Sequence, residues 1–345
     1  MNVEKLKAVG GGGSGRRTET FVHRGLAGSE PMREQSGNDV AMQRLALSAA
    51  GLARDMVGVG AELAPVSVVV PCYRCTDTIA SAVASVAAQK LRPAEVLLVD
   101  DGSGDGTLER LRAIARICPD GWIKVLSMPR NGGPSGARNL GWQHASQTWV
   151  AFLDADDTWH PHKLSLQMEV LASDPEICLL AHRMNVQSRT DPPPALSYPL
   201  KVKVCKRRLM GWGTSFPTAS IVLRRDLPFR FDENRRRAED FLLWAQILLS
   251  GYRCAQINQV LASWHKQPFG EGGLSGDLKA MYEGSVSVRR ALQAEGLIGP
   301  WQMRVLHLSG LLRYARRHVL TYLRRQAATR RLRRPPVETR SRTTS

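Results

Sequence analysis

Apolar runs that end abruptly in polar or acidic residues alternate with helical patterns over roughly ninety residues of this chain. The first run, residues 66–70, consists of valines interrupted only by Ser67 and ended by Pro71. The last run, residues 149–153, breaks directly into the acidic segment 154–157. Strands that alternate with helices predict a parallel sheet covered on both faces, with ligands bound beyond the carboxyl ends of the strands.

The periodicity places each element of this α/β region. In chain order we expect a strand at 66–70, a helix at 78–89, a strand at 95–99, a helix at 107–117, a strand at 123–127, a helix at 135–145 and a strand at 149–153. Three polar segments would then converge on one crevice at the strand ends: residues 71–73, Asp100-Asp101 and residues 154–157.

The acidic segment itself points to a metal ion. Asp154, Asp156 and Asp157 concentrate negative charge, which is costly unless a cation or hydrogen bonds compensate. A hard divalent ion such as Mg²⁺ or Mn²⁺ suits such an oxygen-rich cluster. The alternative is a polar strand exit whose acids only cap the next helix.

Charge and composition narrow the class of protein. The chain has 345 residues, a 43% hydrophobic fraction and a formal net charge of +17. Residues 301–345 hold twelve Arg and a single acid, Glu338, so the basic character belongs mainly to an appendage and argues against a core that binds nucleic acid specifically. No leader-like segment begins the chain and no run reaches the roughly 20 apolar residues of a membrane span, so we expect a cytoplasmic protein.

Two common nucleotide-binding motifs do not fit. Gly102-x-Gly104-x-Gly106 lacks the Rossmann dinucleotide spacing and follows the second expected strand instead of the first. No Gly-x-x-x-x-Gly-Lys-Ser/Thr sequence occurs, which excludes a P-loop of that form.

Four ordered motifs resemble those of the family 2 glycosyltransferases. They are Ser67-Val68-Val69-Val70-Pro71-Cys72-Tyr73, Val99-Asp100-Asp101-Gly102-Ser103-x-Asp105, Asn131-Gly132-Gly133-x-x-x-Ala137-Arg138-Asn139-x-Gly141 and Leu153-Asp154-Ala155-Asp156-Asp157. A later segment, Ala238-Glu239-Asp240-Phe241-x-Leu243-Trp244, resembles the acceptor side of the family. The resemblance covers residues 66 to about 275. It implies a GT-A fold, a nucleotide-sugar donor with a UDP-sugar favoured, and Mg²⁺ or Mn²⁺.

The resemblance also implies roles for residues that would bind the donor. Tyr73 and Asp101 would lie against the nucleoside, with Asp101 accepting a hydrogen bond from the base. Pro71 and Asp100 would belong to the same nucleotide site. Arg138 would lie near the base or the diphosphate.

The resemblance implies that the acidic segment contacts both the donor and the metal ion. Asp154 and Asp156 would serve the ribose and the metal ion, and Asp157 would help to position them or the donor sugar. Which carboxylate touches the ion is left open. His265 is a candidate ligand for the metal or a phosphate, or a surface imidazole, in a segment where Trp264 replaces the tyrosine that is common in the family.

On the acceptor side the resemblance implies that Asp240 is the general base. It would take a proton from the acceptor hydroxyl as the hydroxyl attacks the anomeric carbon, which inverts that centre in one displacement. Glu239 and Trp244 would support it. By itself, the pair Glu239-Asp240 would be explained by the first turn of a helix at 241–249, where the macrodipole favours acids.

The C-terminal part shows a basic amphipathic pattern. Apolar residues recur at helical spacing from Val305 to Leu323, with arginines on other faces. Residues 301–334 could therefore attach to an anionic membrane surface, dock on the catalytic domain or bind a polyanion.

The expected organisation is an α/β chain with a Rossmann-like, mostly parallel central sheet flanked by helices. Its parts are a mobile N-terminal extension at 1–64, a GT-A domain at 65–275 with a nucleotide-sugar half at 65–160 and an acceptor half at 161–275, a C-terminal helical region at 276–334 and a disordered tail at 335–345.

The main functional hypothesis is an inverting, metal-dependent glycosyltransferase that acts on a saccharide or lipid-linked acceptor in polysaccharide or cell-envelope synthesis, peripheral to the inner face of a membrane. The alternatives are a catalytically silent scaffold that binds membrane or polyanion through its basic tail, and a nucleotidyltransferase. The latter lacks a Gly-rich basic phosphate loop after the first strand.

Overall fold

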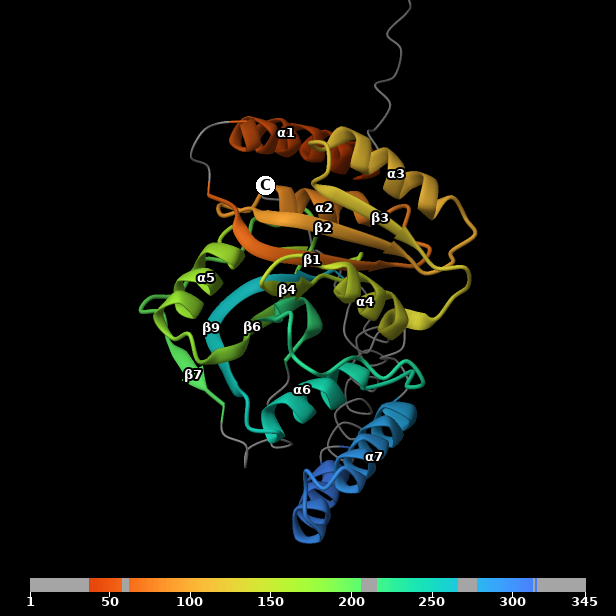
Figure 1. Ribbon diagram of the computed structural model, residues 1–345, viewed down its shortest axis with the longest axis vertical. Helices are drawn as coiled ribbons and strands as arrows, with labels where there is room; N and C mark the ends of the chain where they lie inside the picture. Colours follow the sequence, from red (N-terminus) through yellow and green to blue (C-terminus); the bar gives the residue numbers. More distant parts are fainter. Residues whose placement is uncertain (1–36, 58–61, 206–215, 266–277, 313, 315–345) are drawn as a thin grey trace, which may run out of the picture. The chain divides into compact units, whose positions relative to one another are not determined.

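A single sheet of nine strands is built by the part of the chain that the structure describes. The structure is a computed structural model that describes residues 37–57, 62–205, 216–265, 278–312 and 314. The strand order is β3-β2-β1-β4-β8-β6-β9-β5, with β7 paired to β9. Figure 1 shows the strands between layers of helices.

The first half of the sheet is parallel, as the periodicity predicted. Its elements are β1 (Ala64–Cys72), α2 (Ile79–Ala87), β2 (Pro93–Asp100), α3 (Thr107–Ile117), β3 (Ile123–Ser127), α4 (Gly133–His144) and β4 (Trp149–Phe152). β1 pairs in parallel with both β2 and β4, and β2 pairs in parallel with β3. Each expected element is present, with ends that differ by at most two residues.

Successive valines of β1 pack against different helices because side chains of a strand alternate between the two faces of a sheet. Val68 and Val70 belong to a core cluster with α2 and α3. Val69 belongs to a second cluster with α4 and the later helix α6. All three valines are fully buried. The two clusters explain why these strands read as continuous apolar runs.

The second half of the sheet is mixed in direction. Its elements are β5 (Thr158–Trp159), α5 (Lys163–Ser173), β6 (Ile177–Val186), β7 (Val202–Val204), the 3₁₀ turn η2 (Thr218–Ser220), β8 (Val222–Arg224), α6 (Glu239–Leu249) and β9 (Arg253–Trp264). β8 lies antiparallel between β4 and β6, whereas β6 and β9 are parallel. The predicted parallel order therefore holds for β1 to β4.

A helix, α1 (Gly37–Val57), precedes the sheet within the expected N-terminal extension. Ala41, Leu45 and Ala49 of α1 are buried in the same cluster as α2. Arg110 Nη2 of α3 donates to Asn38 Oδ1 at 2.6 Å. The sequence predicts a mobile arm with one short helix at 42–56; the helix is present and is packed on the domain. Residues 1–36 and 58–61 lie outside the described part.

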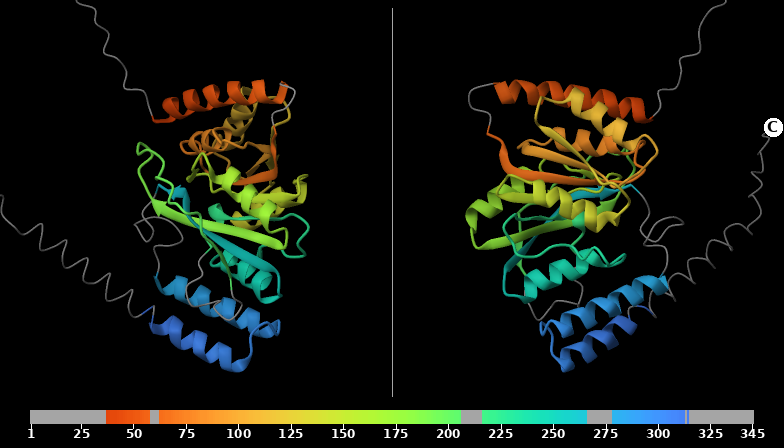
Figure 2. Two further views of the ribbon diagram at one scale, coloured as in Figure 1. Left: turned by 90° about the vertical axis from the view of Figure 1, so that its left-hand side faces the viewer. Right: turned by 45° about the vertical axis from the view of Figure 1, so that its right-hand side comes forward.

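Two helices follow the sheet in the described part of the chain. They are α7 (Leu278–Ala294) and a helix at 300–312. Val288 and Leu292 of α7 are buried in the core cluster that contains α6. Figure 2 shows the two helices side by side beneath α6. The expected tail at 335–345, like residues 315–334, lies outside the described residues.

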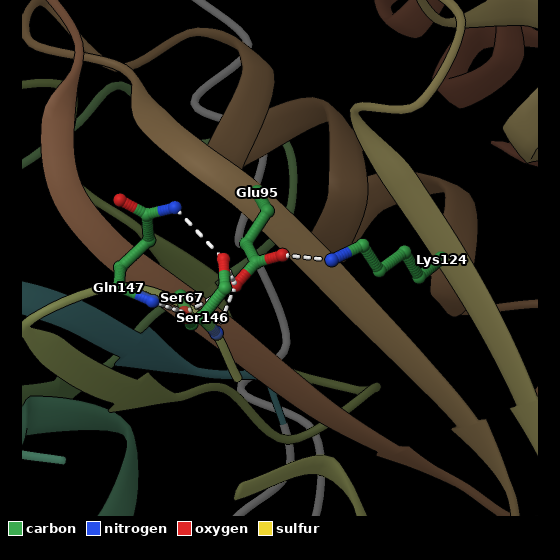
Figure 3. Close-up of polar contacts among 5 residues, drawn as sticks. All are labelled: Ser67, Glu95, Lys124, Ser146 and Gln147. Atoms are coloured by element: carbon green, nitrogen blue, oxygen red, sulfur yellow. Dashed lines mark hydrogen bonds and ion pairs between the residues drawn. The ribbon is translucent and has the colours of Figure 1, made fainter. Parts of the chain in front are cut away.

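A buried carboxylate ties the strands together at their amino ends. Glu95 Oε1 accepts hydrogen bonds from the Ser67 hydroxyl at 2.6 Å and from the Ser146 amide at 2.6 Å, and Lys124 Nζ lies 2.6 Å from Glu95 Oε2. The backbone amide of Gln147 donates to the Ser67 hydroxyl at 3.1 Å (Figure 3). Burial alone would raise the pKa of Glu95, but these hydrogen bonds lower it to about 2.

Candidate functional site

Asp101 connects the end of β2 to the start of α4. Its Oδ1 accepts a hydrogen bond from the Gly132 amide at 2.6 Å, and its Oδ2 accepts one from Asn131 Nδ2 at 3.0 Å. Gly133 has φ of 82°, a conformation that favours glycine, so the turn can bring backbone amides toward the carboxylate. Burial raises the pKa of Asp101, and the amides of Gly132 and Gly133 partly offset this effect.

Asp100 and Asp101 lie beside the end of β1. The Asp101 amide donates to the Cys72 carbonyl at 2.8 Å, and Pro71 is in register with Val99. Tyr73 follows directly, with 46% of its surface exposed. The structure therefore brings the predicted nucleoside residues of β1 and β2 to the same edge of the sheet and leaves the Tyr73 ring accessible.

Two positions of the α4 motif, Asn139 and Gly141, have definite structural partners. Asn139 makes a two-way hydrogen bond with the backbone of Phe231, donating to its carbonyl at 2.9 Å and accepting from its amide at 3.0 Å. A Cβ at Gly141 would collide with the side chain of Val69, so the glycine lets α4 lie close to β1. The motif thus sets the position of α4 on the sheet and ties it to the loop before α6.

Arg138 joins the loop after β4 to the start of α6. Its Nη2 donates to Asp154 Oδ1 at 2.7 Å, and its Nη1 donates to Glu239 Oε1 at 3.2 Å. The side chain is only 6% exposed. Burial would lower the pKa of Arg138, but the carboxylates of Asp154 and Glu239 raise it, so the group stays charged.

Asp240 occupies the first turn of α6 next to this ion pair. Its Oδ2 accepts a hydrogen bond from the Thr218 hydroxyl at 3.2 Å, and its Oδ1 accepts one from the Phe241 amide at 2.7 Å. Burial first, and then the charge of Glu239, raise the pKa of Asp240 to about 6. A carboxylate with a pKa near neutrality is suited to general base catalysis.

Trp244, which was expected to support the site, lies in the core beneath it. The side chain is 1% exposed and packs edge-on against Phe231, with ring centroids 5.6 Å apart. Phe231 in turn lies 5.3 Å below the Arg138 guanidinium and 5.3 Å from the Phe152 ring. These aromatic rings pack beneath the Arg138 guanidinium and support its position.

The loop after β4 is contacted by residues from distant parts of the chain. Arg189 Nη2 donates to the Asp156 carbonyl at 2.7 Å, and burial lowers the pKa of Arg189, partly offset by the charges of Asp156 and Asp157. Sequence reasoning did not identify Arg189, since it follows β6 in a segment without periodicity. Asp157 is buried within this loop.

His265 is held by two protein partners. Its Nδ1 lies 2.9 Å from the Gln187 carbonyl, so this nitrogen must carry the proton, and its Nε2 lies 2.8 Å from the Thr158 hydroxyl, which then donates. Burial lowers the pKa of His265 and favours this neutral form. For His265 to bind a metal ion, the hydroxyl of Thr158 would have to turn away.

The fit to a divalent ion rests on the carboxylates. Among the described residues no three His, Cys, Asp or Glu side chains gather closely enough to hold an ion. Mg²⁺ is usually held by one or two carboxylates together with substrate phosphates and water, so a site completed by the substrate needs no such group. Asp154 and Asp156, both partly exposed at the strand end, fit that donor set.

Known proteins that are similar to this chain identify its family. The Glycosyl transferase family 2 model matches residues 67–229. The UDP-Glc:alpha-D-GlcNAc-diphosphoundecaprenol beta-1,3-glucosyltransferase WfgD of Escherichia coli is 30% identical over 203 residues, covering 56% of this chain and 74% of that protein. The chain belongs to glycosyl transferase family 2.

A second relative is matched over part of its length. The succinoglycan biosynthesis protein ExoO of Rhizobium meliloti (strain 1021) is 33% identical over 203 residues, which are 55% of this chain and 57% of that protein. The chain therefore spans little more than half of that relative.

Solved structures confirm the fold. S. aureus TarS 1-349 aligns with a TM-score of 0.53 and 21% identity over 71% of this chain and 70% of that one. The mannosyltransferase PcManGT from Pyrobaculum calidifontis, solved in complex with GDP-Man and Mn2+, aligns with a TM-score of 0.52 and 19% identity over 84% of this chain and 89% of that one. The predicted GT-A fold is confirmed. The roles of individual site residues remain predictions.

Proposed function

We propose that this family 2 protein is an inverting glycosyltransferase that moves a sugar from a nucleotide-sugar donor to a saccharide or lipid-linked acceptor in cell-envelope polysaccharide synthesis. The observation that carries the proposal is the placement of Asp240. Its carboxylate lies beside the Arg138–Asp154 pair at the carboxyl edge of the sheet, with a pKa raised to about 6. A single base that takes the proton of the acceptor hydroxyl, on the face opposite the departing diphosphate, accounts for inversion of the anomeric centre in one displacement.

The donor side would hold the nucleoside at the ends of β1 and β2. Tyr73 offers an exposed ring for stacking on the base, and Asp101 offers carboxylate oxygens as hydrogen-bond acceptors. We favour a UDP-sugar, since the relative WfgD is named for UDP-Glc and a structure of TarS 1-349 contains UDP-GlcNAc.

Asp154 and Asp156 would hold Mg²⁺ or Mn²⁺ in this proposal. When bound, the ion would stabilise the negative charge that develops on the diphosphate as the sugar bond breaks. Arg138 keeps the Asp154 carboxylate fixed, and the backbone contact from Arg189 fixes the loop at Asp156. These contacts preorganise the loop before the donor arrives.

The acceptor would approach from the side of α6. Asp240 would accept the proton of the acceptor hydroxyl, while Thr218 holds the carboxylate in place. A lipid-linked acceptor lies at a membrane, so the proposal includes a cytoplasmic protein that is peripheral to the inner membrane face. Among the described residues no helix is both long and apolar enough to cross a bilayer.

The test combines binding and turnover. The melting temperature is measured with UDP-, GDP-, CDP- and dTDP-sugars, with and without Mn²⁺, and we expect stabilisation by a UDP-sugar that depends on the metal. A ligand at a hundred times its dissociation constant adds about 2.7 kcal/mol. Asp101→Asn should weaken this stabilisation, whereas Asp120→Asn, at an exposed acid before β3, should leave it unchanged.

Turnover separates an enzyme from a silent scaffold. Asp240→Asn should retain the stabilisation by the donor and lose release of nucleoside diphosphate to an acceptor. The anomeric configuration of the product, read by NMR, should be opposite to that of the donor. Retained configuration, or full turnover by Asp240→Asn, would contradict the proposed mechanism, and a flat binding panel with a folded protein would favour the scaffold.

A further inference from the structure

The helix at 300–312 packs on the protein through one face. Met303 and Leu306 pack against the core cluster of α6 and α7, and Gly310 is buried against α7. Tyr314, just beyond, lies against Tyr282 of α7 with ring centroids 4.8 Å apart. These positions are separated by three or four residues, so they lie on the same side of the helix.

The opposite side of this helix is an apolar stripe that faces solvent. Trp301 is 72% exposed, Leu308 61% and Leu312 64%, and Val305 completes the stripe between them. The spacing of four, three and four residues places all four side chains roughly half a turn from the packed face. We call these four residues the outer stripe. Large apolar side chains that gather on one face typically mark an interaction surface.

Charge identifies the kind of surface that would cover the outer stripe. Arg304 is exposed on the same helix. Residues 301–345 contain twelve arginines and one acid, and eleven of these arginines lie between residues 313 and 342. An apolar helix face that is followed in the sequence by many arginines suits the interface of an anionic bilayer, since lipid head groups attract the cations and the acyl region accepts the apolar side chains. A protein partner would need to match both features.

The outer stripe has a firm connection to the catalytic segment. Ser287 Oγ of α7 accepts a hydrogen bond from Arg235 Nη1 at 2.9 Å, and Gly284 lies close against Arg237. Both arginines lie just before Asp240 in the sequence. The pair formed by α7 and the helix at 300–312 lies beneath α6 (Figures 1 and 2). A surface bound to the outer stripe is therefore held at a fixed position relative to the start of α6.

We propose that the outer stripe inserts into the interface of an anionic phospholipid bilayer and thereby seats the enzyme with its acceptor side on the membrane. Trp301 and the two leucines enter the boundary between head groups and acyl chains, and Arg304 contacts the head groups. Binding to lipid does not depend on the proposed transferase activity, because it is measured without a donor. The consequence for a lipid-linked acceptor does rest on that activity.

The test uses the full chain and vesicles. Binding is measured by sedimentation with vesicles of pure phosphatidylcholine and with vesicles of equimolar phosphatidylcholine and phosphatidylglycerol. We expect binding to the anionic vesicles that weakens as salt is added. The double substitution Leu308→Asn and Leu312→Asn should weaken it by roughly a hundredfold. Leu47→Asn is the matched control, since Leu47 is a leucine 72% exposed on the helix α1.

The outcomes separate the possible occupants of the stripe. Loss of vesicle binding in the double variant, with an unchanged melting temperature and normal binding by Leu47→Asn, supports the proposal. Absence of binding by the wild type, or equal binding by the double variant, overturns it. A dimer seen by light scattering that the double variant abolishes, without vesicle binding by the wild type, also overturns it and assigns the stripe to a second copy of the chain.

An activity arm tests the seating separately. On a short soluble acceptor the double variant should match the wild type, because neither leucine belongs to the candidate site. On an acceptor embedded in anionic vesicles it should lose roughly the same factor as vesicle binding. Equal loss on both acceptors would show damage to the catalytic site instead and overturn the seating, and inactivity of the wild type on both would count against the proposed function while leaving the lipid binding result intact.

Discussion

Arg138 Nη2 donates a hydrogen bond to Asp154 Oδ1 at 2.7 Å, from the middle of α4 to the loop that follows β4. The same guanidinium reaches Glu239 at the start of α6. One buried cation therefore holds together three segments that are far apart in the sequence. The predicted donor loop and the predicted base are thus positioned by a common residue.

Replacing Arg138 by lysine should destabilise the protein. A single ammonium cannot serve Asp154 and Glu239 in the geometry of the guanidinium, so one of the two carboxylates is left poorly paired. We expect a loss of about 2–4 kcal/mol in the free energy of unfolding, measured with urea. Arg253→Lys is the control, because Arg253 pairs with Asp174 at the surface with 44% of its side chain exposed, and it should change stability by less than about 1 kcal/mol.

Gly141→Ala should also destabilise the protein, through packing alone. The added Cβ would collide with Val69, which lies in the centre of β1 and has no room to move. We expect a loss of about 1–3 kcal/mol in thermal or urea unfolding. Gly299→Ala, where a Cβ would meet only Gln302 Oε1 at 3.7 Å, should be close to neutral. Equal effects of the two changes would mean that α4 can shift on the sheet.

The sequence predicts the first half of the fold well because two periodicities are clear there. β1, β2 and β4 are largely buried on both faces and read as apolar runs, β3 is a partly exposed edge strand, and the helices between them show regular spacing. The sequence did not predict that β8 and then β6 lie next to β4 in the sheet. β8 has three residues, Val222–Arg224, and a run so short carries no periodic signal.

The site is predicted less completely than the fold. The motifs identify Asp101, Arg138 and Asp240 and include Glu239 and Asp154, but they do not identify Thr218, which reaches Asp240 only through tertiary packing. Arg189 gives no signal of its own in the sequence, although it contacts the loop at Asp156. The residues that contact the candidate site from distant segments are therefore the ones that sequence patterns miss.

The C-terminal helix shows a related limit. Its apolar spacing was predicted from Val305, Leu308 and Leu312, and the same spacing is compatible with docking or with membrane binding. In the described part of this helix the packed face is formed by other residues, Met303 and Leu306 among them, whereas Leu308 and Leu312 of the predicted stripe are exposed. An amphipathic pattern indicates a helix face that needs a partner, but a second face can pack as well.

Glu95→Gln should lower stability in a way that depends on pH. The pKa of Glu95 is lowered from 4.5 to about 2 in the folded protein, so its contribution is fully present above pH 4.5 and is lost as the pH falls toward 2. We expect the variant to lose roughly 2–4 kcal/mol of unfolding free energy at pH 7. The difference from the wild type should shrink steadily below pH 4.5.

The location of Glu95 supplies the control for that experiment. The residue lies at the amino ends of the strands, with Ser67, Lys124 and Ser146 around it (Figure 3), whereas the candidate site lies at the carboxyl ends. Activity per folded molecule should therefore be unchanged in Glu95→Gln. A large loss of activity at a temperature where the variant is folded would contradict a purely structural role.

Asp240→Asn should stabilise the protein while it abolishes turnover. The pKa of Asp240 is raised from 3.8 to about 6, so the carboxyl contributes most below pH 3.8 and that contribution is lost as the pH rises through 6. At pH 7.5 the wild type carries the cost of the ionised group and the asparagine does not. Because the group is partly exposed, we expect a gain on the order of 1–2 kcal/mol in unfolding free energy at that pH.

The pH dependence of turnover tests whether Asp240 acts as the base. A base must be ionised, so kcat/KM should fall as the pH drops below about 6. Substitutions of two neighbours should move this acid limb of the pH profile in opposite directions. Glu239→Gln removes a repulsive charge and should shift the limb to lower pH, whereas Thr218→Val removes a hydrogen bond to the ionised form and should shift it to higher pH.

These opposite shifts distinguish a direct role of Asp240 from general damage to the site. Damage would lower kcat/KM at every pH without moving the limb, and titration of another group would be insensitive to both substitutions. Glu239→Gln also removes a partner of Arg138, so its plateau rate is expected to drop as well. The position of the limb, read independently of the plateau, is therefore the quantity that decides whether the carboxylate at the start of α6 takes the proton.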